Sequence, residues 1–428
     1  MRSRHLNFPR PDVFGWFASL RRVSRILWVR VALIIALSLI AALSAPLLDT
    51  WIPQNLKERF TEDALMPILT ILASSMLTVA TFSLGVMVSS HRSLADQTTP
   101  RIHRLLMEDT STQSMLASFI GAFAFALLSI ILFGAHYYSE GATVIVFAAT
   151  VAIVALIIVS LIRWIRQLSR IGSVDYALER AERTARETLD GIQRRPHLGG
   201  MPMPEDGIPV SASYTIKVPQ SGFLRWIDVQ ELSDIANKVQ AEIYAVHLPG
   251  DLLLEGQPLA RSTKEVDADD VAACFWIGKN RSYDQDARYA IAALRETATK
   301  ALSPGINDPG TAVEVVSRLE RLLWDAFKIE TDDNEHRFNN VYVATTPDSV
   351  LIDTAFRDIS RDGAKFVDLL LGIHRALDAL RQTCNADAHD MIDQLHAAVD
   401  ENAETGLVTL SEQTRYAAGR SSIGQRTR

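Results

Sequence analysis

The sequence has few cysteines and lacks the short motifs that identify common catalytic sites. Its 428 residues include two cysteines, Cys274 and Cys384, so no disulfide framework is expected and a reducing compartment fits. There is no HExxH, no GxSxG, no Walker loop and no His or Cys cluster at metal-ligand spacing. The pair His389 and His396, seven residues apart, is interpreted as part of a surface face. We therefore expect no metal and no cofactor.

The chain also lacks a positive charge excess, and charge is missing from four long stretches in its first two fifths. A net charge of -7 argues against nucleic acid as a partner. Each uncharged stretch has about 18 residues or more, the length that a helix needs to cross the hydrocarbon layer. We expect a four-helix membrane domain in a lipid bilayer, followed by a mixed α+β cytoplasmic domain. The expected spans are Val31–Leu48, Ala64–Ser90, Thr110–Ala135 and Gly141–Ile162.

The first span could instead be a signal peptide, but about thirty residues precede it and proline follows its candidate cleavage point, Ala45. Arginines gather before the first span, in the middle connector and after the fourth span, whereas the other two connectors carry little positive charge. Both termini are therefore expected to be cytoplasmic. No ionisable residue lies inside the spans, where one would mark an ion path.

The second span has a face of small and hydroxyl-bearing residues at helical spacing. Two interpretations are open: close packing of helices through small side chains, or a hydroxyl-lined pore in a homo-oligomer. The residues are Thr70, Ser74, Thr78, Thr81, Gly85 and Ser89.

The connector after the second span, DQTTPRIHR, is expected to lie at the membrane surface. Pro100 disfavours helix at the preceding residue, and Thr98 or Thr99 can cap a new helix with Pro100 at its first position. Its basic side chains would contact anionic lipid headgroups, or alternatively a specific anion. The candidate loop residues are Gln97, Pro100, Arg101 and Arg104.

Beyond the membrane domain the hydrophobic period changes from helical to alternating and back. An exposed stalk helix that continues the fourth span is followed by a Pro- and Gly-rich linker. The next segment weakly resembles the barrel-sandwich module of biotinyl and lipoyl carrier domains, without a carrier lysine. The expected division is a basic segment 1–30, a transmembrane domain 31–165, a stalk 166–193, a β-rich module 194–263, a helical domain 264–418 and a disordered tail 419–428.

The stretch ALSPGINDPGTA is predicted to be a corner between two helices. Gly305 can take the left-handed cap conformation, Asn307 or Asp308 can cap the next helix, and Pro309 fits its first position. The free amides of that helix start could alternatively bind an anion or form an interface, although the Asp308 carboxylate would compete with a phosphate. The candidate residues are Asp286, Ser303, Pro304, Gly305, Asn307, Asp308, Pro309 and Thr311.

Two segments, DQTTPRIHRLL and IGKNRSYDQDARYAIAALRETATKALSPGINDPGTAVEVVSRL, together resemble the bacterial predicted membrane proteins called the domain of unknown function 2254 family. Asp286 and Ser303–Thr311 match the family's most specific motif, whereas Thr98 and Thr99 depart from its loop signature. The resemblance implies this architecture and a bacterial inner membrane, and it assigns no activity.

Three functions follow as hypotheses. The first is a non-enzymatic, channel-like or sensory oligomer with a cytoplasmic regulatory domain. The second is a membrane-anchored scaffold that docks a cytoplasmic protein. The third is an enzyme with a site near Asp286, Arg295 and Ser303–Asp308, which the missing catalytic motifs disfavour.

Overall fold

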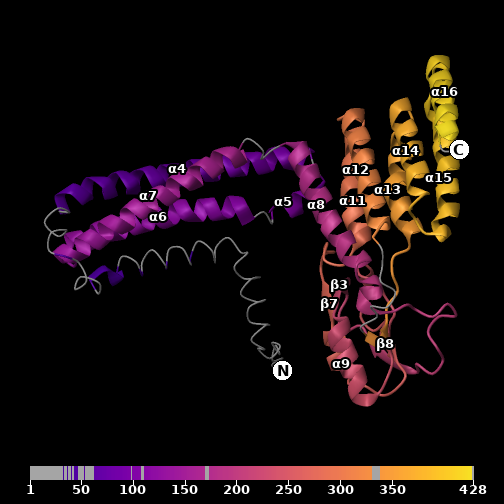
Figure 1. Cartoon of the computed structure of the whole chain (residues 1–428), viewed down its shortest axis with the longest axis horizontal. Helices are drawn as coiled ribbons and strands as arrows, with labels where there is room; N and C mark the ends of the chain where they lie inside the picture. The colour runs from indigo at the N-terminus through magenta and orange to yellow at the C-terminus, as the bar shows by residue number, and fades with distance from the viewer. Residues whose placement is uncertain are drawn as a thin grey trace. The chain divides into compact units, whose positions relative to one another are not determined.

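The computed structural model describes residues 32, 36, 40, 43–46, 53, 62–97, 99–107, 110–168, 173–329 and 338–426. The chain divides into two compact units (Figure 1). The first contains Met1–Gln97 and His103–Tyr176, and the second contains Thr98–Ile102 and Ala177–Arg428. The expected basic segment 1–30 and most of the first expected span lie outside the described residues.

Long apolar helices make up the described part of the first unit. They are α4 (Glu62–Gln97), α6 (Thr110–Gly134) and α7 (Glu140–Leu168). Within the described ranges, three segments are long and apolar enough to cross a membrane, namely Glu62–Ser90, Ser114–Gly134 and Glu140–Gln167. These confirm three of the four expected spans.

The core of this unit lies where α4 packs against α6. Leu65 and Leu69 from α4 are fully buried, as are Phe119 and Phe125 from α6. Apolar residues that point elsewhere, such as Phe82 at 64% exposure, remain uncovered. In a membrane, lipid tails would solvate such side chains, so their exposure fits the bilayer as the surrounding medium.

Two sheets form the β-rich part of the second unit. A five-stranded sheet has the order β1-β8-β4-β6-β2, and a three-stranded sheet has the order β5-β3-β7. The short helix α9 (Val229–Val239) packs on β8. The strands are β1 (Gly200–Met201), β2 (Tyr214–Lys217), β3 (Gly222–Ile227), β4 (Ile243–Ala245), β5 (Leu252–Leu253), β6 (Pro258–Ser262), β7 (Phe275–Gly278) and β8 (Phe338–Tyr342).

This sheet topology does not confirm the barrel-sandwich expectation. β8 pairs in parallel with both β1 and β4. Its residues lie well after position 263 in the sequence, where the β-rich module was expected to end. The segment VDADDVAACFWIG forms α10 (Ala268–Ala273) and then β7. Its last four residues, FWIG, pair along β3.

The remaining helices of the second unit form a helical layer in which α11 contacts α12 and α13, and α14 contacts α12, α15 and α16 (Figure 1). Gly363 ends α13. The helices are α8 (Val174–Gln193), α11 (Ala287–Leu302), α12 (Pro309–Phe327), α13 (Asp348–Asp362), α14 (Val367–Leu380), α15 (His389–Gly406) and α16 (Leu410–Arg426).

Two helices differ from the sequence-based expectation. The stalk was expected to be exposed, but α8 buries one face, including Ala181 and Leu189, and its Glu182 pairs with Arg318 of α12 at 2.9 Å. Its Ala, Leu and Thr residues recur at helical spacing and give it a face that can pack. α16 runs to Arg426, so most of the segment expected to be a disordered tail is helical.

Candidate functional site

The start of α11 carries a buried ion pair. Asp286 is the N-cap of this helix and accepts a hydrogen bond from the Tyr289 backbone N–H at 2.9 Å. The Arg281 guanidinium donates to both carboxylate oxygens, from Nε at 2.7 Å and from Nη2 at 2.8 Å. The Asp286 side chain is 1% exposed. A buried carboxylate needs such a bidentate partner, because unpaired it would be costly to remove from water.

Arg101 joins this site from a distant part of the sequence. Its guanidinium carbon lies 5.0 Å from the centroid of the Tyr289 ring, and the Arg281 guanidinium carbon lies at the same distance from that ring. Arg101 Nη1 pairs with Glu296 Oε1 at 2.8 Å, and the Tyr283 hydroxyl donates to the Arg101 backbone oxygen at 3.4 Å. We call Arg101, Tyr283, Tyr289 and Glu296 the Arg101 cluster.

The cluster changes the expectation for the connector at Pro100. Helix α5 (Pro100–Met107) begins at Pro100, and Thr99 Oγ1 accepts from the Ile102 N–H at 3.5 Å, so the predicted cap is confirmed. Arg101 was expected to face lipid headgroups, but its side chain is paired with a carboxylate and an aromatic ring of the second unit. Headgroup contact by exposed Arg104 stays a prediction, and the side chain of Gln97 lies outside the described residues.

The β-rich part approaches the same helix start through the turn Pro249-Gly250-Asp251. Gly250 has φ +96°, and a Cβ there would lie 2.2 Å from Asp286 Oδ2. Asp251 pairs with Arg288 at 2.7 Å, and Arg288 also donates to the Pro249 carbonyl at 3.3 Å. Only glycine leaves room for the buried carboxylate at this point.

The predicted corner after α11 is present, but the residue with the left-handed backbone differs from the expected one. Asp308 caps α12, with Oδ1 accepting from the Thr311 N–H at 3.1 Å and Oδ2 accepting from the Thr311 hydroxyl at 2.5 Å. These bonds hold the pKa of Asp308 below its usual value. Asn307, not Gly305, has the left-handed backbone, with φ +53°. Because Asp308 occupies the donors at this helix start, the corner is internally satisfied.

The expected grouping of Asp286 with the corner is wrong as a single site. Asp286 precedes α11 and Ser303 follows it, so a sixteen-residue helix separates them by about 24 Å. Ser303 Oγ donates to the Lys300 carbonyl at 2.6 Å, and Asn307 Oδ1 accepts from Lys365 Nζ at 3.2 Å. Pro309 takes the first position of α12, as predicted. Pro304 and Gly305 form the exposed turn between these groups.

The hydroxyl-bearing face of α4 points away from the packed core. Its residues are all exposed, whereas the opposite face carries the buried Leu65, Leu69 and Leu72. The hydroxyls donate to carbonyls of their own helix, for example Thr78 Oγ1 to Ser74 O at 3.0 Å. Internal bonding lets a hydroxyl face apolar surroundings without an unpaired donor. The face comprises Thr70, Ser74, Thr78, Thr81, Gly85 and Ser89.

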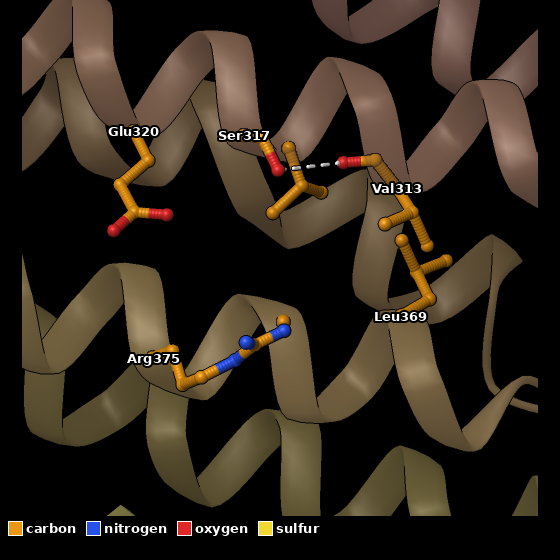
Figure 2. A pocket seen from close by; sticks show the side chains of 7 residues that line it. Val313, Ser317, Glu320, Leu369 and Arg375 are labelled. Atoms are coloured by element: carbon orange, nitrogen blue, oxygen red, sulfur yellow. Dashed lines mark hydrogen bonds between the residues drawn. The ribbon is translucent and has the colours of Figure 1, made fainter.

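A small pocket of about 120 Å³ lies between α12 and α14 (Figure 2). Glu320 extends into it from α12, and Arg375 extends from α14. Burial raises the pKa of Glu320, and the charge of Arg375 opposes that rise. The volume is at the scale of a few water molecules, below that of most ligand sites.

Sequence reasoning missed a buried histidine pair in α14 and α15. His396 was interpreted as part of a surface face with His389, but it is 9% exposed and its Nδ1 lies 2.7 Å from Nδ1 of His374, which is 0% exposed. The spacing of Leu370, Ile373 and Leu377 around His374 places it on the apolar face of α14. That pattern could have predicted its burial, but not its partner.

Comparison with known proteins agrees with this membrane architecture. The chain is 24% identical over 264 residues to the uncharacterized protein Rv1290c of Mycobacterium tuberculosis (strain ATCC 25618 / H37Rv), a match covering 59% of this chain and 50% of the relative. The uncharacterized protein Mb1321c of Mycobacterium bovis matches equally. The chain thus spans about half the length of these relatives. No solved structure matches significantly.

A family model for predicted membrane proteins matches residues 24–379. The matched range includes the three described membrane helices, the Arg101 cluster and the corner before α12. Since it covers most of the sequence, the chain belongs to the DUF2254 family of predicted membrane proteins.

Proposed function

We propose that this chain is a non-enzymatic, sensory and channel-like membrane oligomer, in which the water-soluble unit regulates the membrane helices. The observation that carries the proposal is the Arg101 cluster. The segment Thr98–Ile102 belongs to the second unit, yet in sequence it directly joins α4 to the chain leading to α6. A change in the second unit can therefore act on the connector between two membrane helices through side-chain contacts.

The contacts of the cluster suit this role because they combine charge with an aromatic surface. Arg101 is held by an ion pair to Glu296 and by the face of Tyr289, and both partners lie on α11. The ion pair is partly exposed, at 30% for Arg101 and 26% for Glu296. Such contacts are strong enough to orient a segment and weak enough to be reversed.

The exposed hydroxyl face of α4 supports the channel-like part of the proposal. When copies of α4 meet around an axis, the face would line a polar path, and its hydroxyls could exchange their intrahelical acceptors for water or ions. In this proposal the protein is a homo-oligomer in the bacterial inner membrane, and both termini of each copy lie in the cytoplasm.

Ion flux into vesicles containing the purified protein tests the proposal. We expect flux above that of empty vesicles, reduced by Thr78→Val, which replaces a hydroxyl with a methyl group of similar size. We expect Arg101→Ala and Glu296→Gln to change the flux by similar factors, because both break the same ion pair. Arg381→Ala, which removes an arginine paired with Asp393 in the same unit, is the matched control and should leave the flux unchanged.

Two results would contradict different parts of the proposal. Absence of flux for the wild-type protein at every voltage, pH and membrane tension would refute the channel. Flux that is insensitive to Arg101→Ala and Glu296→Gln would refute regulation through the Arg101 cluster.

A second candidate, a scaffold for a cytoplasmic protein, is favoured by the outer face of the three-stranded sheet. Leu252 is 58% exposed and Trp276 is 45% exposed, with the Trp226 ring 6.1 Å from that of Trp276. Exposed aromatic side chains are typical of protein interfaces. A partner captured by the wild type and lost with Leu252→Ser, while vesicle flux is absent, would favour the scaffold.

A further inference from the structure

Three helices of the second unit meet around the histidine pair. Besides the contact between the two Nδ1 atoms, His396 Nε2 lies 3.1 Å from Asp378 Oδ1, and His374 Nε2 lies 2.7 Å from the Tyr416 hydroxyl. That hydroxyl also donates to Asp400 at 2.5 Å. We call these five residues the histidine cluster. It links α14, α15 and α16 through side chains that are far apart in the sequence.

The geometry of the cluster leaves one ring nitrogen ready to take a proton. In the neutral pair, His396 can donate from Nε2 to Asp378 and accept at Nδ1 from the Nδ1–H of His374. His374 Nε2 then faces the Tyr416 hydroxyl at 2.7 Å and Asp400 Oδ1 at 3.3 Å, and that hydroxyl donates its hydrogen to Asp400. An added proton would therefore bind at His374 Nε2, on a ring that is 0% exposed.

The charged groups around the two rings have opposing effects on protonation of the imidazoles. Asp378 on α14 and Asp400 on α15 favour an imidazolium, whereas burial and Arg420 on α16 disfavour it. Burial is the largest effect, and it lowers the pKa of His374 to about 3 and also lowers the pKa of His396. Asp393 on α15 also interacts with His396, and Glu404 on α15 acts on Tyr416.

Helix α16 is the element of the cluster that can leave most easily. Many of its described side chains are exposed. Its other contacts include Arg415 with Asp368 at 2.5 Å, Arg420 with Asp400 at 3.7 Å and Gly419 against Leu371 of α14, where a Cβ would lie 2.5 Å from Leu371 Cδ1. Opening α16 would expose His374 to water and remove the cause of its low affinity for a proton.

We propose that the histidine cluster is a proton-binding site, and that proton uptake releases α16 from α14 and α15. The coupling between proton binding and helix packing gives the direction of the pH dependence. A histidine whose pKa is lowered in the packed state binds protons better once it is exposed, so its contribution to packing is complete above about pH 6.5 and declines as the pH falls. At pH 5.0, one such ring lowers the equilibrium constant for packing of α16 by about 30-fold. The proposal does not depend on the Arg101 cluster or on ion flux.

Hydrogen exchange measured by mass spectrometry on the full chain in lipid nanodiscs tests this. After correction for the intrinsic pH dependence of exchange, amides of α16 should lose about 30-fold in protection between pH 7.5 and 5.0. Amides of α11 and α12 should keep theirs.

Variants identify the responsible group. His374→Gln should abolish most of the pH response, whereas His389→Gln, which removes a histidine of α15 outside the cluster, should leave it intact. If His374→Gln fails to fold, the wild-type measurement still decides. Unchanged or increased protection of α16 at pH 5.0, or loss of protection in α11, α12 and α16 together, would overturn the proposal.

Discussion

Removing the Arg281 guanidinium should strongly destabilise the second unit. Arg281→Ala would leave the Asp286 carboxylate, 1% exposed in the intact structure, with the Tyr289 N–H as its remaining partner among the contacts described above. An uncompensated buried charge costs about 3–5 kcal/mol. In a unit of this size, each kcal/mol lowers the unfolding temperature by about 2–4 °C, so we expect a decrease of about 10 °C.

A second substitution separates the effect of the buried charge on stability from the effect of the lost side-chain packing. Asp286→Asn keeps a residue that caps helices well and removes the negative charge. Arg281→Ala combined with Asp286→Asn should therefore be more stable than Arg281→Ala alone, although each change is destabilising by itself. Arg361→Ala is the control, since Arg361 is 65% exposed in its ion pair and should change stability by less than about 0.5 kcal/mol.

Thermal unfolding of the purified protein, followed by circular dichroism, measures these differences. An Arg281→Ala protein within 1 °C of the wild type would refute the assignment of a buried, paired charge at the start of α11. A double variant less stable than Arg281→Ala would show that packing, not charge, decides the effect.

Three further predictions concern other contacts. Gly250→Ala should lower the unfolding temperature by several degrees, because its Cβ would collide with Asp286 at a positive φ; Gly256→Ala, which has φ +86° and no atom within 4 Å, is the control. Asp308→Ala should lower the free energy of unfolding by about 1 kcal/mol, because the helix cap is lost. Since the pKa of Asp308 is lowered in the folded protein, this difference in unfolding free energy between variant and wild type should shrink as the pH falls below about 4. Cys274 should resist maleimide at pH 7.5 in the folded protein, because burial raises its pKa to about 12, and labelling as fast as in denaturant would contradict this.

The membrane helices and the local caps were predictable because their causes are local. Long uncharged runs fix a span without knowledge of its neighbours, and Asp308 followed by Pro309 specifies a helix start within a few residues. The same reasoning failed for Gly305, since the left-handed residue is Asn307, two positions later in the sequence. Either residue can adopt that conformation, so composition alone does not choose between them.

The long-range contacts of the Arg101 cluster and the histidine cluster were not predictable because they join distant segments. Arg101 meets Tyr289 across 188 positions in the sequence, and no local signal pairs them. His374 and His396 each lie on an apolar helical face, but only the packing of α14 on α15 brings their nitrogens together. Asp286 and the corner were grouped because both match the family's motif, and the length of α11 separates them.

The position of β8 has a consequence for how the protein is made. This strand lies between β1 and β4 in the five-stranded sheet, yet it is synthesised after α11 and α12. The sheet therefore lacks an interior strand until Tyr342 emerges, and the neighbouring edges of β1 and β4 stay open during that interval. A fragment that stops before Phe338 should therefore be prone to aggregation.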